Sequence, residues 1–151
     1  MFNFLSTKST VMNTEIFSNI NWLAVLVAVI AYFMLGALWY SKALFGSKWA
    51  AIVGLDMNDP DKSKGMAKMM IGTFVLILVT CIGLALLINR LDLSILASGL
   101  KLGAITGICF ATTAVAISFI YESRPTALYF IDCGYHLAGH LIAAIVLVLW
   151  R

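Results

Sequence analysis

The sequence predicts an all-α fold in which four transmembrane helices form a small membrane bundle, as one domain over residues 1–151. Hydrophobic residues make up 62% of the chain and charged residues only 11%, whereas an average soluble domain has about 25% charged residues. In addition, four long apolar runs follow one another. A helix that crosses a bilayer needs roughly 20 apolar residues, and each run reaches this length.

The four predicted helices cover, in order, about residues 20–40, 66–89, 97–121 and 127–150. Arg90 and Asp92 mark a short turn between the second and third helices, and the segment "ESRP" marks the turn before the last one. Pro125 ends this segment and suits the first turn of a helix. A β-barrel is excluded, because its strands would give short segments of alternating polarity.

The longest connector follows the first helix and contains Asp59 and Pro60, which predict a helix start. With the "ESRP" turn, its side of the membrane receives six Lys and Arg residues, against four on the other side. Positive residues favour the cytoplasmic side, so both termini are expected outside. We expect an integral membrane protein of the bacterial inner (plasma) membrane.

Small residues recur at four-residue spacing in the last two helices. Gly99, Gly103 and Gly107 open the third helix, and Gly134 precedes Ala138 by the same step. Such spacing lets two helix backbones approach closely, although glycine is also common in membrane helices generally. The contact is within one chain or between copies. Because four short helices bury little surface, the expected partners are the lipid bilayer and a second copy or another membrane protein.

Aromatic residues and lysines alternate after the first helix, in the stretch "WYSKALFGSKW". Trp39, Tyr40, Phe45 and Trp49 are predicted to anchor the chain at the membrane–water boundary, where aromatic side chains are enriched. A ligand groove is the alternative interpretation of the same residues.

The last helix carries a polar ladder. Asp132, His136 and His140 are four residues apart, so they share one helix face, and Tyr135 flanks His136. A charged residue at the centre of a membrane helix costs roughly 2.5–3.5 kcal/mol on insertion scales. This face is therefore predicted to point into the bundle.

Three interpretations of the ladder stay open. In the first, Asp132 accepts a hydrogen bond from His136 or from Arg124, which lies with Glu122 at the mouth of the last two helices. In the second, the histidines form a proton or ion path, because histidine changes charge near neutral pH. In the third, two histidines and a carboxylate hold a metal ion.

Other functions lack a motif. Cys81, Cys109 and Cys133 lie in apolar runs without a CxxC pair, so packing is their expected role and no disulfide framework is predicted. The net charge of +3 is scattered, which argues against a nucleic-acid partner. No GxSxG, phosphate-binding glycine loop or carboxylate pair is present, so no cofactor is expected and an enzyme is not favoured.

Two segments resemble the signatures of the domain-of-unknown-function family 1761. They are "NWLAVLVAVIAYFMLGALWYSKALFGSKW", Asn21 to Trp49, and "YESRPTALYFIDCGYHL", Tyr121 to Leu137. The chain departs from the pattern at Lys42, where the family usually has proline, so a less sharp bend is expected after Tyr40.

The resemblance implies a small four-helix integral membrane protein of unassigned activity. It singles out Trp39, Tyr40, Phe45, Gly46, Trp49, Arg124, Pro125, Asp132, Gly134, Tyr135 and His136. His140 lies outside the signature, which favours Asp132, Tyr135 and His136 as the important cluster. The leading functional hypothesis is a transport-like unit or an assembly partner, and the alternative is a membrane-embedded metal-binding protein or enzyme.

Overall fold

The structure is a computed structural model that describes residues 17–56 and 63–151. The described residues are helical and contain no strand, and four of the helices are long and apolar enough to cross a membrane. The predicted all-α fold with four such helices is thereby confirmed. The helix start predicted at Asp59 and Pro60 lies outside the described residues.

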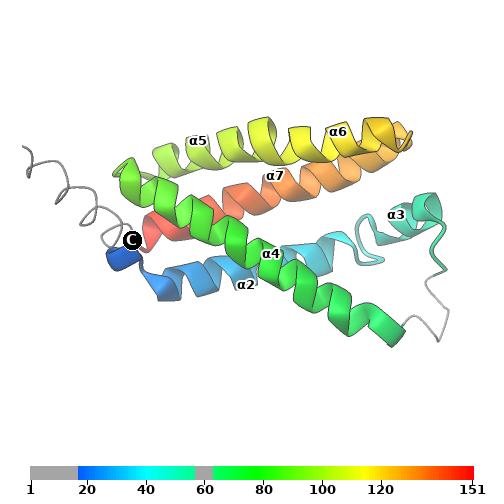
Figure 1. Ribbon diagram of the computed structural model, residues 1–151, viewed down its shortest axis with the longest axis horizontal. Helices are drawn as coiled ribbons and strands as arrows, with labels where there is room; N and C mark the ends of the chain where they lie inside the picture. Colours follow the sequence, from blue (N-terminus) through cyan, green and yellow to red (C-terminus); the bar gives the residue numbers. More distant parts are fainter. Residues whose placement is uncertain (1–16, 57–62) are drawn as a thin grey trace, which may run out of the picture.

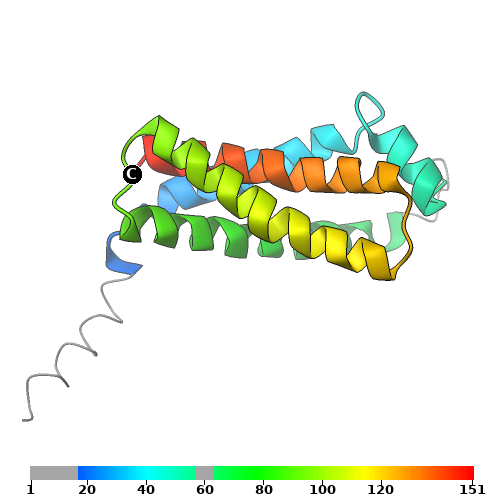
Figure 2. The same cartoon turned by 90° about the horizontal axis from the view of Figure 1, so that it is seen from above.

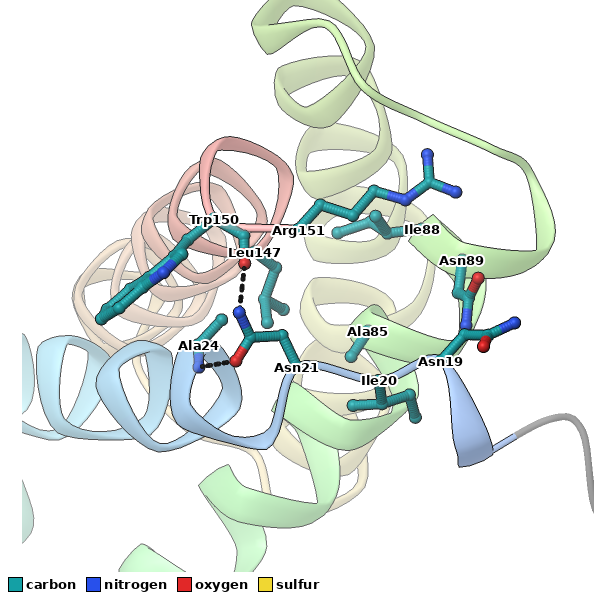
Figure 3. Close-up of a pocket in the computed structure, with 10 residues that line it drawn as sticks. All are labelled: Asn19, Ile20, Asn21, Ala24, Ala85, Ile88, Asn89, Leu147, Trp150 and Arg151. Carbon is teal, nitrogen blue, oxygen red and sulfur yellow. Dashed lines mark hydrogen bonds between the residues drawn. The ribbon is translucent and has the colours of Figure 1, made fainter.

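The first long helix, α2 (Trp22–Trp39), starts where the side chain of Asn21 caps it. Asn21 Oδ1 accepts a 3.1 Å hydrogen bond from the Ala24 amide, and Asn21 Nδ2 donates at 3.1 Å to the carbonyl of Trp150. A cap of this kind satisfies an amide that the first helical turn leaves free. Figure 3 shows how this one side chain ties the start of α2 to the end of the last helix, beside a cavity of only about 20 Å³.

After α2 the chain turns into the short helix α3 (Gly46–Val53). The Phe45 amide donates to the Trp39 carbonyl at 3.0 Å, and the Gly46 amide donates to Ser41 at 2.9 Å. A Cβ atom on Gly46 would lie 2.6 Å from the Ser41 carbonyl oxygen, so only glycine fits this turn. The chain therefore reverses tightly here, although it lacks the proline expected by the family pattern at Lys42.

The second long helix, α4 (Ser63–Arg90), packs with only one of its halves. Its second half is buried against α2 and α7 through Ile77, Cys81, Leu84, Ala85 and Ile88. In its first half Met69 is 70% exposed and Leu76 is 69% exposed. Figure 1 shows α4 crossing α2 diagonally, so that its first half diverges from the other helices at the end where α3 lies.

The third span is a continuous helical run made of α5 (Leu96–Thr106), a π-helical turn η2 (Gly107–Thr112) and α6 (Thr113–Tyr121). The fourth, α7 (Thr126–Leu149), follows Pro125. Both views show the third span packed along α7 (Figures 1 and 2). The π turn widens the helix where Gly107 would bring a Cβ atom within 3.2 Å of Leu137 Cα.

The last helix is the centre of the fold, because α7 touches α2, α3, α4, α5, η2 and α6. The start of α2, the α4–α5 turn and the end of α7 lie at one end of the molecule (Figures 1 and 2). The turn before α7 and helix α3 lie at the other end. Residues of α7 therefore lie next to several other helices.

Candidate functional site

A hydrogen bond joins the end of α2 to α7, at the end of the bundle where α3 lies. The Tyr40 hydroxyl donates to Asp132 Oδ1 at 2.7 Å, and Asp132 is half-buried. Tyr40 lies just beyond the last residue of α2. Burial and the hydrogen bond to Asp132 raise the pKa of the Tyr40 phenol above its ordinary value, so it stays a donor.

Arg124, one of the two residues expected to donate to Asp132, pairs with Glu122 instead. Arg124 Nε donates to Glu122 at 2.8 Å, in an exposed turn before α7. Neither His136 nor Arg124 is the donor to Asp132; Tyr40 takes that role. Asp132 is therefore hydrogen-bonded to a residue from the other end of the sequence, and neither of the two expected donors takes this role.

Deeper in the bundle, Tyr32 of α2 meets both histidines of α7. Its hydroxyl lies 3.1 Å from His136 Nδ1 and 3.5 Å from His140 Nδ1. Tyr32 is only 2% exposed, and its ring packs directly on Gly139, where any Cβ atom would overlap it. The two histidines of the ladder thus converge on the phenol of Tyr32, whereas Asp132 is bonded to that of Tyr40.

The hydrogen bonds assign the tautomer of a neutral His140. Its Nδ1 lies 2.8 Å from the His136 carbonyl, which only accepts, so this nitrogen carries the hydrogen. The Tyr32 hydroxyl lies 3.1 Å from His136 Nδ1 and 3.4 Å from the His136 carbonyl. Its single hydrogen goes to one of these two atoms, and both tautomers of His136 are compatible with the contact.

Tyr135 lies between the Tyr40–Asp132 hydrogen bond and the contact of Tyr32 with the two histidines. Its ring centroid lies 5.4 Å from that of Tyr32 and 5.3 Å from that of Tyr40. The residue is 6% exposed, yet its hydroxyl has no hydrogen-bond partner among residues 17–56 and 63–151. A Cβ atom on Gly36 would lie 2.9 Å from this hydroxyl, so glycine at this position makes room for it.

A cavity of about 530 Å³ lies against this cluster, between the first half of α4 and the helices α2, α3 and α7. The exposure of Met69 and Leu76 in its wall shows that it opens at the outer surface beside α4. The lining is apolar with a few hydroxyl groups and one imidazole: Tyr32, Phe33, Gly36, Ala37, Tyr40, Trp49, Met69, Met70, Thr73, Leu76, Ile77, Thr80, Tyr135 and His136. Ligand sites of this size and composition, roughly 300–1,000 Å³, are usual in proteins.

The four aromatic residues predicted as boundary anchors fall into two pairs. Trp39 packs on Phe45 at 4.9 Å between ring centroids, and its indole donates to the Ile131 carbonyl at 3.0 Å. Tyr40 packs on Trp49 at 5.4 Å, and both line the cavity. The second pair therefore supports the ligand-groove alternative.

The glycines singled out by spacing all lie against other helices. On α5 and η2, Gly99, Gly103 and Gly107 face α7, where an added Cβ would come within 2.8–2.9 Å of Val148, His140 or Leu137. Gly134 lies 3.2 Å, by the same measure, from Trp39. These contacts are within one chain.

A metal centre finds little support. Within the described part of the chain, no group of three His, Cys, Asp or Glu side chains could hold a metal ion. His140 is buried and does not line the cavity, and Asp132 is hydrogen-bonded to Tyr40 instead. The two histidines share a phenol, not a carboxylate.

Sequence reasoning did not single out Tyr32, nor the position and the mainly apolar lining of the cavity. A signal was present, because Tyr32, Gly36 and Tyr40 repeat at four-residue spacing, as Asp132, His136 and His140 do. Two antiparallel helices with such ladders pair the end of one with the start of the other. Tyr40 accordingly meets Asp132, and Tyr32 meets the histidines.

The fold is that of a small polytopic protein whose four long helices are suited to a membrane. The chain belongs to the family described as protein of unknown function (DUF1761), whose family model matches residues 23–148. The resemblance to this family is thereby confirmed. No curated protein and no solved structure matches the chain.

Proposed function

We propose that this chain binds a small molecule within the bilayer and acts as a transport-like unit. The observation that carries the proposal is the cavity of about 530 Å³ whose wall includes His136 and Tyr135. A purely structural ladder predicts a dry, fully packed bundle around these residues. A cavity at the ladder supports the binding function over that interpretation.

The composition of the wall favours a molecule over an ion. Among the described residues that line the cavity there is no Asp, Glu, Lys or Arg. An ion in a bilayer interior needs charges or many polar groups around it, because its desolvation is expensive. The ion-path interpretation is therefore less well supported than binding of an uncharged molecule.

The membrane context of the proposal follows the charge distribution. We propose the bacterial inner membrane, with both termini outside and the α3 end of the bundle in the cytoplasm. Outward-facing apolar side chains on the third span, such as Ile108, Phe110 and Ile117, are available to lipid or to a second copy. A homo-oligomer through this surface would leave the cavity beside α4 open.

A filled cavity tests the binding function. Thr73 lines the cavity from α4 and is exposed, so Thr73→Phe adds a ring to the cavity without entering the core. Val75→Phe is the matched control, because Val75 is also exposed on α4 but does not line the cavity. The three proteins are purified in the same mild detergent, and their organic extracts are compared by mass spectrometry.

The expected result is a small molecule that co-purifies with the wild type and with V75F, and falls by roughly tenfold or more with T73F. Three extracts that contain the same bulk lipids in the same amounts would contradict the proposal. Circular dichroism and size-exclusion profiles of T73F establish that it is folded before the extracts are compared.

A further inference from the structure

We propose that the cavity takes an uncharged, lipid-soluble molecule with a planar ring and a carbonyl oxygen, that is, a molecule of the quinone class. This inference rests on the proposed binding function and names the class of its ligand. The observations concern the hydrogen-bond donor left free at the wall, the rings that line it and its position beside α4.

The first observation is a buried donor without a partner. Tyr135 lines the cavity, its hydroxyl lies against Gly36 in the same wall, and no residue of the described chain accepts its hydrogen bond. A buried polar group that stays unpaired is costly, so the native site is expected to supply an acceptor. A carbonyl oxygen in the cavity is such an acceptor.

The second observation is which of the other polar groups are already committed. The Tyr40 hydroxyl donates to Asp132 at 2.7 Å, and the Thr80 hydroxyl donates within its own helix to Leu76 at 3.1 Å. His136 lines the cavity, and its Nδ1 contacts the Tyr32 hydroxyl, so Nε2 is the ring nitrogen without a partner among the described residues. The Tyr135 hydroxyl therefore offers a donor beside the ring of His136 and favours a ligand that accepts.

The third observation is that one part of the wall is aromatic, which favours one ligand shape over another. Phe33, Tyr40 and Trp49 bring aromatic rings to the cavity from α2, the turn and α3. Aromatic rings prefer offset or edge-to-face contact with another ring, which favours a planar ring over a flexible chain at this end. The exposed Met69 and Leu76 on the α4 side offer an apolar path for a tail toward lipid.

Trp49 supplies the readout, because a quinone bound beside it quenches its fluorescence. The probe is decylubiquinone, titrated into the full-length protein in lipid nanodiscs. The variants are Tyr135→Phe, which removes the donor and keeps the ring, and Thr73→Phe, which fills the cavity. Tyr121→Phe is the control, because it removes a hydroxyl from a residue that is 87% exposed on another helix. Trp49→Phe identifies the part of the signal that comes from the cavity.

The expected result is saturable quenching in the wild type and Y121F, an apparent Kd about tenfold weaker in Y135F, and no saturable quenching in T73F or W49F. Equal, non-saturating quenching in all variants would mean partition into lipid only and would overturn the proposal. So would an unchanged Kd in Y135F.

A competition experiment separates the quinone ring from other carbonyl compounds. Methyl decanoate has a carbonyl group without a planar ring, and dodecane has neither. Displacement of decylubiquinone by methyl decanoate at equal concentration would overturn the ring requirement, whereas the proposal expects neither compound to displace it. In one outcome T73F loses a co-purifying molecule, but decylubiquinone gives no saturable quenching in any of the proteins, the wild type included. The ligand class is then wrong and the binding function stands.

Discussion

The Tyr40 hydroxyl and the Asp132 carboxylate form a 2.7 Å hydrogen bond between residues 92 positions apart in the chain. The bond joins the end of α2 to the first turns of α7, at the end of the bundle where α3 lies. It explains how a membrane helix accommodates an aspartate, because a phenol from the neighbouring helix satisfies the carboxylate. Both residues belong to the two segments, Asn21 to Trp49 and Tyr121 to Leu137, whose resemblance to the family was described from the sequence, so the contact joins these segments.

Removing this donor should destabilise the protein. In Tyr40→Phe the half-buried Asp132 loses the hydrogen bond from Tyr40, and a hydrogen bond to a charged group contributes about 1.5–3 kcal/mol. We expect a lower midpoint of thermal unfolding in detergent than for Tyr121→Phe, which loses only an exposed hydroxyl. Equal midpoints for Y40F and Y121F would show that the hydrogen bond does not stabilise the fold.

Tyr135→Phe should behave in the opposite way. Its hydroxyl has no partner within the described residues, so its removal takes away no protein hydrogen bond. In protein freed of small molecules by repeated detergent exchange, the unfolding midpoint of Y135F should equal that of the wild type or exceed it. A loss as large as that of Y40F would mean that a protein group accepts this hydrogen bond.

The contact of Tyr32 with His136 should appear as a coupling between the two residues. A double-mutant cycle of Tyr32→Phe and His136→Ala should give an interaction energy of about 0.5–3 kcal/mol, as neighbours in a hydrogen-bond network do. Tyr32→Phe with Cys109→Ser is a control pair, because Cys109 is exposed on η2. Additive effects in the Tyr32–His136 cycle would argue against the contact.

Replacing a glycine that touches another helix with alanine should lower the yield of folded protein far more than replacing a glycine that touches none. A Cβ atom on Gly139 would overlap the Tyr32 ring, so Gly139→Ala forces α2 and α7 apart. Overpacking of this kind costs about 1–3 kcal/mol or more. Gly83→Ala is the matched control, because nothing lies within 4 Å of the added methyl group. The measurement is the yield of folded protein by size exclusion, and an equal yield of G139A and G83A would contradict the packing.

The fold was predictable because its signal is local. Apolar runs of sufficient length report membrane helices directly, and the turns at Arg90 and Pro125 separate the last three. The pairing of Asp132 was not predictable in the same way. Arg124 was the nearer candidate along the chain, but it pairs with Glu122 in the exposed turn, and Tyr40 reaches Asp132 through the antiparallel packing of α2 on α7.

The position of the cavity could not be predicted from the sequence, for a different physical reason. It exists because α4 packs on α2 with its second half and diverges with its first half, which is a property of the crossing geometry. The first half of α4 contains Lys64 and Lys68, but its cavity-lining residues Met69, Met70 and Leu76 are as apolar as those of the packed half, so they do not mark it as the open half. The π turn at Gly107–Thr112 could not be predicted from the sequence either, since its residues suit an ordinary membrane helix.

The most direct test is a high-resolution structure of the protein in lipid nanodiscs, examined between α4 and the Tyr135 side chain. The binding function and its ligand class predict non-protein density in the cavity, with an acceptor atom within hydrogen-bond distance of the Tyr135 hydroxyl. They also predict that Tyr40 still donates to Asp132. A closed bundle in which the first half of α4 packs on α2, with the Tyr135 hydroxyl bonded to a protein group and no space beside it, would contradict both.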